Sequence, residues 1–336
     1  MQKDSEVLTY QHNYSQLTPM NYIITGGSSF IGVALTKLLI GRNHNVYVVC
    51  RETSKSNANI PNSEYVHTVY YKDMSDIQSI TKFIETADVF IHLAWAGTSH
   101  GGRYDKNLQD SNVTYSLEAI EVAHQLGCKL FVEAGSQAEY GFVNAPFDEN
   151  TECHPENEYG RGKLEFGEKA SKRCQEFGMK FIHLRIVSIY GESDHMWTLV
   201  MSCIRKMLNN EDVLLSTCEQ NWNFVYIKDA VKQMYLLCEH ALKSPDFISE
   251  IYLIGSKDTR VLKDFVYEMM RLTDSSSKLV FGGYTPANIV SLDPIMDKTE
   301  KATGGFLSDF SFSDVVKIII NNYKHNQYEE NQQSHF

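Results

Sequence analysis

The sequence predicts an α/β fold in which a doubly wound parallel sheet is followed by a smaller C-terminal α/β lobe. Three observations support this prediction: short apolar runs end in turn residues, helical segments separate these runs, and a glycine-rich turn directly follows the first run. Strands that are buried on both faces of a parallel sheet are apolar throughout, and each parallel connection needs a crossover such as a helix. Alternation of this kind is typical of a doubly wound sheet.

The elements follow in order along the first half of the chain. Apolar runs bounded by turn residues predict strands at 22–25, 46–50, 88–94 and 129–134. The segments at 31–40 and 107–126 are long enough for crossover helices. Beyond residue 185 the alternation weakens, so we expect a smaller lobe, although the runs at 224–227 and 251–254 have the character of strands that could return to the main sheet.

These patterns divide the chain into four parts. Residues 1–20 form a polar extension before the fold, and 21–185 form the main domain. Residues 186–322 are mainly the smaller lobe, and the polar tail at 323–336 is predicted to be disordered.

The composition argues against several classes of protein. A formal net charge of −11 disfavours a nucleic-acid-binding surface, which needs an excess of Lys and Arg. The seven cysteines are scattered, and neither they nor the histidines have the spacing of metal ligands. No apolar run approaches a membrane span, and the N-terminus lacks an apolar signal segment. The sequence therefore predicts a cytoplasmic protein without a metal, membrane or nucleic-acid partner.

The glycine-rich turn at 25–32, TGGSSFIG, has the chemistry of a phosphate-binding loop. Small residues let the backbone approach a pyrophosphate, and a helix start supplies N–H donors and the positive end of a dipole. An isolated match of this kind could be only a tight strand–helix turn, but its place after the first strand favours dinucleotide binding. The main domain would then bind NAD(P), and the smaller lobe would bind the substrate.

The end of the second strand favours NADP(H), while NAD(H) is the alternative. An NAD-binding protein usually places an acid here to hold the ribose hydroxyls. This chain has Cys50 and then Arg51, with Ser54 and Lys55 nearby, and a cation suits a 2′-phosphate. The other interpretation is that Arg51 is a solvated loop charge.

A possible catalytic group lies at Tyr159 and Lys163, which share one face of a helix because they are four residues apart. A nearby ammonium favours phenolate, so we expect Lys163 to lower the pKa of Tyr159. Gly160 and Gly162 suggest that a flat ring approaches this helix closely. Ser136 follows the strand at 129–134, at the edge of the sheet where α/β sites form. Taken alone, the Tyr–Lys spacing would be an ordinary surface pair, and Ser136 a loop serine.

Several motifs in one order resemble the extended short-chain dehydrogenase/reductases, the nucleotide-sugar epimerase/dehydratase group. The resemblance covers about 22–254 and rests on TGGSSFIG, Asp73 in KDM, HLAWAG, GSQAEYG and YGRGK. It implies a Rossmann-type sheet, a homodimer through the helices at 107–126 and 159–177, and catalysis by Ser136, Tyr159 and Lys163.

The resemblance also implies contacts with the cofactor and the substrate. The implied cofactor-binding residues are Thr25, Gly26, Ser28, Ser29, Phe30, Ile31, Gly32, Arg51, Asp73, Met74, Leu93, Ala94, Trp95, Tyr159 and Lys163. The implied substrate-binding residues are Arg103, Ser136, Gln137, Trp222 and Arg260.

Departures from the family pattern narrow the activity. Dehydratases of this group carry an Asp-Glu pair where this chain has Gln137 and Ala138, and loss of these acids disfavours dehydration. Trp222 stands where many relatives have an arginine that holds the diphosphate, and Arg260 is the candidate replacement. The GSQAEYG form is similar to that of the CDP-paratose/abequose-type synthases.

The favoured hypothesis is therefore reduction of a nucleotide-linked 4-keto-6-deoxyhexose by NAD(P)H. Tyr159 would be the acid, Ser136 would hold the ketone oxygen, and Lys163 would tune Tyr159. The alternative is an NAD-dependent nucleotide-sugar 4-epimerase like UDP-glucose 4-epimerase, which would use the same three residues. A non-catalytic dinucleotide-binding protein is the third hypothesis, because the fold alone does not establish activity.

Overall fold

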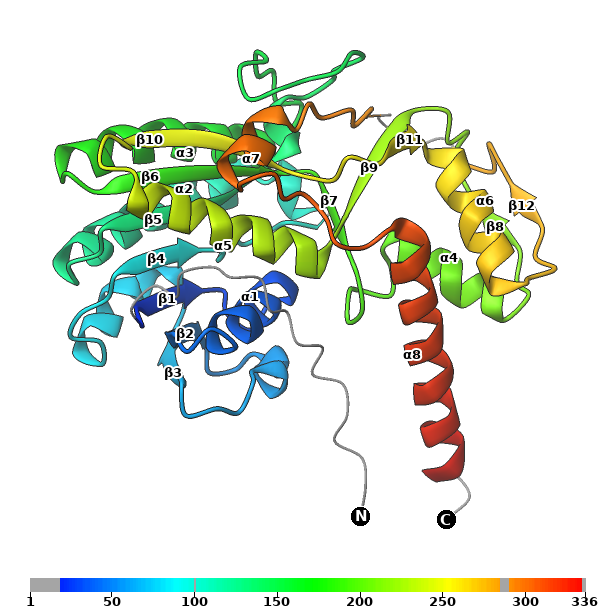
Figure 1. Ribbon diagram of the computed structural model, residues 1–336, viewed down its shortest axis with the longest axis horizontal. Helices are drawn as coiled ribbons and strands as arrows, with labels where there is room; N and C mark the ends of the chain where they lie inside the picture. The colour runs from blue at the N-terminus through cyan, green and yellow to red at the C-terminus, as the bar shows by residue number, and fades with distance from the viewer. Residues whose placement is uncertain (1–18, 100, 285–289, 334–336) are drawn as a thin grey trace.

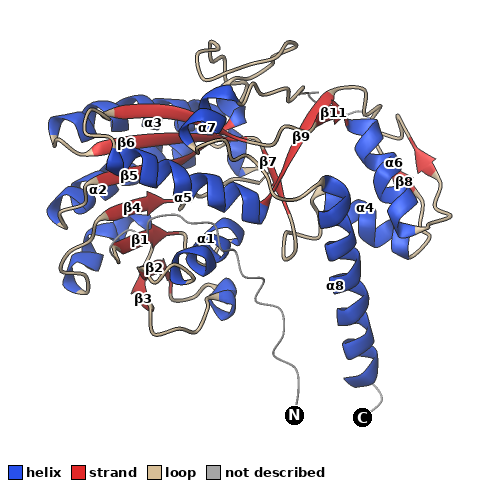
Figure 2. Cartoon of the chain, in the orientation of Figure 1, coloured by secondary structure: helices blue, strands red, loops and turns tan. Residues whose placement is uncertain are grey.

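The computed structural model describes residues 19–99, 101–284 and 290–333. Its main body is a seven-stranded parallel sheet with helices on both faces, which Figures 1 and 2 show together with a smaller lobe. The predicted fold class is confirmed. The strands, in spatial order, are β10 (Ser249–Ile254), β6 (Lys180–Ile186), β5 (Leu130–Ser136), β4 (Val89–His92), β1 (Asn21–Thr25), β2 (Asn45–Arg51) and β3 (Val66–Tyr71).

The strand order places a crevice beside β1. The chain moves outward from β1 through β2 to β3 and then returns to β4 on the other side of β1. At such a switch point the connections leave the sheet in opposite directions, so a ligand can bind outside the carboxyl ends of the strands. The loops that follow β1 and β4 therefore form the expected binding edge.

Helices cover both faces of this sheet because its strands are apolar on both sides. In β1, Tyr22 and Ile24 belong to one buried cluster and Ile23 to the other. The first cluster includes α1 (Phe30–Ile40) and α5 (Ile227–Lys243), which pack together; the second includes α2 (Lys106–Gln125) and α3 (Glu158–Glu176). Short 3-10 helices occur at η1 (Lys55–Asn59), η2 (Met74–Lys82), η3 (Gly102–Tyr104) and η4 (Gln137–Glu139).

The smaller lobe contains two small sheets and three further helices (Figure 1). One sheet comprises β7 (Ser188–Tyr190), β9 (Asn221–Tyr226) and β11 (Thr259–Val261), and the other comprises β8 (Val213–Leu214) and β12 (Leu279–Val280). The helices are α4 (Leu199–Leu208), α6 (Leu262–Thr273) and α8 (Phe312–Gln333), while α7 (Asp297–Ala302) packs against β10 and α5.

Of the two late strands predicted to be able to return to the main sheet, one does. The run at 251–254 lies in β10, which pairs with β6. The run at 224–227 lies instead in β9, which joins the small sheet, and Ile227 begins α5. Phe224 is held in the lobe by aromatic contacts with Phe265 and Phe312.

The predicted disordered tail is wrong for residues 323–333, since α8 continues through Gln333. Its first turns bury Val315, Val316 and Ile319, and the polar residues that follow extend the same helix. Residues 1–18 and 334–336 lie outside the described residues. In the described ranges no helix is both long and apolar enough to cross a membrane.

Candidate functional site

The turn between β1 and α1 needs small residues for steric reasons. Gly26 has a positive φ of 66°, and a Cβ at this position would lie 2.9 Å from the backbone nitrogen of Ala94. A Cβ on Gly32 would lie 2.6 Å from the carbonyl oxygen of Gly26. Ser29 caps α1 by accepting a hydrogen bond from the Gly32 N–H at 3.2 Å. The backbone N–H groups at the start of α1 can therefore face the crevice, where they could bind a phosphate.

A cavity of about 1540 Å³ runs from this turn along the carboxyl edge of the sheet. Ten of the predicted cofactor-binding residues line it: Gly26, Ser28, Ser29, Phe30, Arg51, Asp73, Met74, Leu93, Ala94 and Trp95. Thr25 and Gly32 support this wall, since Thr25 Oγ1 bonds His92 Nδ1 at 2.8 Å and Gly32 packs on the turn. Ile31 follows Phe30 in the first turn of α1. The cradle at Gly26 and the capped helix start fit a dinucleotide.

At the ribose end of this cavity, the residues contributed by the end of β2 and the segment after it include no carboxylate, since Glu52 is not among the lining residues. Cys50, Arg51, Ser54, Ser56 and Asn59 line it there. The backbone carbonyl of Arg51 accepts hydrogen bonds from Asn57 Nδ2 at 2.9 Å and from the Ser54 N–H at 3.0 Å, which fold η1 beside the strand end. Across the cavity, Asp73 caps η2 by accepting from the Ser75 N–H at 2.9 Å.

The catalytic candidates meet beside Trp95, which lines the cavity, although Ser136, Tyr159 and Lys163 are not themselves among its lining residues. Ser136 ends β5, and Tyr159 and Lys163 lie in the first turns of α3, whose N-cap Asn157 accepts from the Gly160 N–H at 2.9 Å. Trp95 stands edge-on to Tyr159, with ring centroids 6.4 Å apart, and Lys163 Nζ lies 3.6 Å from the Trp95 ring centroid. These elements come from three separate parts of the chain.

The expected lowering of the Tyr159 pKa by Lys163 is wrong in this structure. Burial raises the pKa of Tyr159, and a hydrogen bond with Ser136 and the charge of Arg103 oppose that rise only in part. The guanidinium of Arg103 lies 4.5 Å from the centre of the Tyr159 ring. Lys163 is directed elsewhere: its Nζ lies 3.4 Å from Glu133 Oε1, and burial lowers its own pKa. At neutral pH Tyr159 is therefore a protonated phenol.

The glycines of α3 make room for protein atoms, which corrects the expectation of a bare surface for a flat ring. A Cβ on Gly160 would lie 2.2 Å from the carbonyl oxygen of Ala138. On Gly162 it would lie 3.4 Å from the Trp95 ring, which is ordinary contact. Gly160 thus lets α3 pack on η4, which brings Tyr159 to Ser136.

The predicted substrate-binding residues lie in two different places, near Tyr159 and in the smaller lobe. Gln137 begins η4 directly after Ser136, and Arg103 covers Tyr159, so both lie at the catalytic end. Trp222 and Arg260 face each other across β9 and β11 in the smaller lobe. Arg260 is already paired with Asp258 and Glu268, each at 2.7 Å. Its role with a diphosphate stays a prediction.

The sequence reasoning missed residues from the smaller lobe and its connections to the main domain. Ser193 and His195 after β7, Lys228 and Asp229 at the start of α5, and Asp309 before α8 all line the cavity. They are far apart in the sequence and carry no shared motif, so only the tertiary structure collects them. In the described part of the chain no group of three or more His, Cys, Asp or Glu residues is placed to hold a metal ion.

Glu133 is a further candidate that the sequence motifs do not identify, although its place in the sequence is unusual. This carboxylate lies inside an otherwise apolar central strand and is 0% exposed. A buried charge of this kind needs partners. They are Lys163 and His183, and Glu133 Oε2 lies 2.5 Å from His183 Nδ1.

The charge of His183 should make stability depend on pH. Burial disfavours the imidazolium, but Glu139 and Glu133 together raise the pKa of His183 from 6.5 to about 10. The folded state then binds an extra proton, so this contribution is complete below about pH 6.5 and is lost as the pH rises to about 10.

Chemical denaturation across this range should show the free energy of unfolding falling by roughly 1–3 kcal/mol more in the parent protein than in His183→Gln. The matched control is His44→Gln, because burial lowers the pKa of His44. Equal slopes for the parent and His183→Gln would contradict a charged His183.

Comparison with known proteins settles the family. Residues 22–255 match the NAD dependent epimerase/dehydratase family. The chain belongs to this family. It is an NAD-dependent enzyme of the extended short-chain dehydrogenase type, as the sequence motifs predict.

Several named proteins align with most of the chain. CDP-abequose synthase of Salmonella muenchen is 22% identical over 308 residues, covering 89% of this chain and 96% of that protein. The dTDP-4-dehydro-6-deoxyglucose reductase of Escherichia coli is 25% identical over 286 residues, covering 81% and 88%. The structure of UDP-N-acetylglucosamine 4-epimerase from Methanobrevibacter ruminantium M1 superimposes with a TM-score of 0.81 at 18% identity over 92% of this chain and 100% of that one, which shows a shared fold.

Proposed function

We propose that this enzyme reduces the 4-keto group of a nucleotide-linked 6-deoxyhexose. The observation that carries the proposal is the phenol of Tyr159, which is hydrogen-bonded with Ser136 and packs edge-on against Trp95 of the cavity wall. Burial raises the pKa of this phenol, which favours its protonated form. Reduction of a ketone needs a proton donor, whereas oxidation of an alcohol needs a base at the same place. The names of the two curated relatives, a CDP-abequose synthase and a 4-dehydro-6-deoxyglucose reductase, agree with this substrate class.

The dinucleotide, when bound, supplies the hydride that forms the new C–H bond. Tyr159 gives its phenolic proton to the ketone oxygen, so that a hydroxyl forms. Ser136 Oγ accepts the Ala138 N–H at 3.1 Å and is hydrogen-bonded with Tyr159, so its hydroxyl lies beside the phenol that would meet the ketone oxygen. Gln137 and Ala138 cannot act as acids in this turn, which supports reduction without dehydration.

The test is the stoichiometry of the reaction. Purified enzyme given a nucleotide-linked 4-keto-6-deoxyhexose and NADPH should consume one NADPH for each ketone that is reduced to a hydroxyl. Absorbance measures the loss of NADPH, and chromatography measures the sugar product. Interconversion of two nucleotide sugars without net loss of dinucleotide would instead establish a 4-epimerase. Binding of dinucleotide without turnover of any keto sugar would contradict the proposal.

We further propose that NADP(H) is preferred over NAD(H). The cation of Arg51 and the hydroxyls of Ser54 and Ser56 line the ribose end, where Cys50 takes the place of an acid. Arg51→Ala is expected to raise the KM for NADPH by about 10- to 100-fold, the value of a hydrogen bond to a charged group, and to change the KM for NADH little. The control is Lys55→Ala, on the neighbouring turn. Equal effects of Arg51→Ala on both dinucleotides would oppose this preference.

We also propose a cytoplasmic homodimer that pairs the α2 and α3 surfaces of two chains. These helices lie side by side and are joined within one chain by an ion pair of 2.5 Å between Arg161 and Asp110. Sedimentation equilibrium would measure the state directly, and a monomer at micromolar concentration would rule the dimer out.

A further inference from the structure

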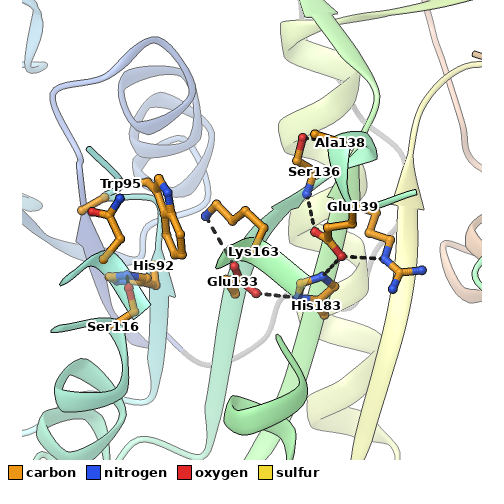
Figure 3. Close-up of polar contacts among 12 residues, drawn as sticks. His92, Trp95, Ser116, Glu133, Ser136, Ala138, Glu139, Lys163 and His183 are labelled. Atoms are coloured by element: carbon orange, nitrogen blue, oxygen red, sulfur yellow. Dashed lines mark hydrogen bonds and ion pairs between the residues drawn. The ribbon is translucent and has the colours of Figure 1, made fainter. Parts of the chain in front are cut away.

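A buried chain of charges connects two of the catalytic candidates through residues that take no part in the proposed chemistry. Figure 3 shows it running from Lys163 through Glu133, His183 and Glu139 to the backbone of Ser136. His183 Nε2 lies 2.8 Å from Glu139 Oε2, and Glu139 Oε1 accepts the Ser136 N–H at 2.7 Å. His183 is 3% exposed. The chain thus links α3, β5, β6 and η4 at the catalytic end.

Both ring nitrogens of His183 face carboxylates, so only the imidazolium can donate to both. The contact between His183 and Glu133 is 2.5 Å, whereas the contact between Glu133 and Lys163 is 3.4 Å. Glu133 is therefore held mainly by His183, while the ammonium of Lys163 also lies over the ring of Trp95 in the cavity wall.

The space around the imidazole is shaped by two glycines. A Cβ on Gly167 of α3 would lie 2.6 Å from His183 Cε1, and a Cβ on Gly135 of β5 would lie 2.6 Å from His183 Nε2. Any larger residue at either position would displace the ring from one carboxylate. The absence of side chains at Gly135 and Gly167 thus leaves room for an imidazolium between β5, β6 and α3.

We propose that His183 is a positioning residue for the reduction: it fixes Glu133 at its distance of 3.4 Å from Lys163 and holds Glu139 under the Ser136 turn. This inference rests on the proposed function. Without the His183 charge, Glu139 would still be paired with Arg185, but Glu133 would draw Lys163 toward itself. The charge of Glu133, which raises the pKa of Tyr159, would then no longer be balanced by the imidazolium.

Other charged groups also lie near the imidazole of His183 and its carboxylate partners. Arg185, from the same strand, donates to Glu139 Oε2 at 2.8 Å. The groove that His183 and Arg185 line is also bordered by Glu149, Glu168, Lys172, Glu250 and Lys298. Arg185 keeps Glu139 paired when His183 changes, so the largest change falls on Glu133 and, through it, on Lys163.

The experiment compares His183→Gln with the control His44→Gln in the intact enzyme. His44 is also buried, and its Nδ1 accepts from the N–H of Met20, the residue before β1, at 3.2 Å. In His183→Gln, kcat should fall about 10- to 100-fold, as expected for displaced catalytic groups, while the KM for the nucleotide sugar stays near that of the parent. The alkaline limb of the pH–rate profile should move to higher pH, because the charge of Glu133, no longer balanced by the imidazolium, favours the protonated phenol of Tyr159. An alkaline limb and a kcat equal to those of His44→Gln would overturn the proposal.

Two further variants extend the test, and the first of them keeps it decisive if His183→Gln does not fold. Gly167→Ala retains the histidine and favours the helix, yet should push the ring and move the alkaline limb in the same direction. In a double-mutant cycle, His183→Gln should add little in a Glu133→Gln background, because His183 acts through Glu133. Additive losses in kcat, or a Gly167→Ala profile like that of the parent, would show that His183 is only structural.

A readout independent of the sugar separates this inference from the proposed function. Nitrogen-15 spectra of histidine-labelled protein at pH 8.5 should show one ring with both nitrogens protonated, and this signal should be missing in His183→Gln. If the parent reduces no keto sugar but the signal is present, the proposed function fails and the charged bridge stands. A neutral His183 at pH 8.5 would refute the bridge whatever the activity.

Discussion

Replacing Tyr159 by Phe is expected to lower the kcat for sugar reduction by about 10²- to 10⁴-fold, the usual contribution of a positioned general acid. The variant keeps the ring that packs edge-on against Trp95 and under Arg103, so the shape of the site is preserved. Only the phenolic hydroxyl is removed, and with it the transferable proton and the hydrogen bond with Ser136. The dissociation constant for NADPH, measured by fluorescence titration, should stay close to that of the parent.

The matched control is Tyr104→Phe, which makes the same chemical change on an exposed ring beside Arg103. It should retain full activity. If Tyr159→Phe reduced the keto sugar at the parental rate, the proton would have to come from another group, and the assignment of Tyr159 as the acid would be abandoned.

Adding one methyl group to Gly160 is expected to damage the enzyme far more than adding it to Gly162. A Cβ at position 160 would meet the Ala138 carbonyl at 2.2 Å, and because that atom belongs to the backbone, α3 or η4 must shift. A displacement of about 1 Å between Tyr159 and Ser136 can cost about 100-fold in rate. Gly160→Ala should therefore lose activity of that order and also lower the melting temperature.

Gly162→Ala should behave in the opposite way. Its Cβ would reach ordinary contact with Trp95, and alanine favours a helix over glycine by about 0.5–1 kcal/mol. The melting temperature should rise slightly, and the activity should remain comparable to that of the parent. Calorimetry and steady-state rates on the two variants side by side test the packing of α3 on η4. Equal behaviour of the two variants would mean that this packing does not position Tyr159.

Much of the architecture could be read from local sequence features. Apolar runs and intervening helices predicted the parallel sheet, since the period of burial follows directly from backbone geometry. The turn at Gly26 was equally readable because its positive φ and its approach to Ala94 require glycine. The shared face of Tyr159 and Lys163 followed from helical spacing alone. The roles of these residues in catalysis stay predictions.

Sequence alone determined which groups the chain carries and where each lies on its own strand or helix, because those depend on near neighbours. Tertiary structure decided the protonation of Tyr159, the direction of Lys163 and the destination of β9. These depend on partners that are distant in the chain, as His183 and Glu133 are, 50 residues apart. A pKa reflects the charges and the burial around a group, and only the folded chain brings those charges together.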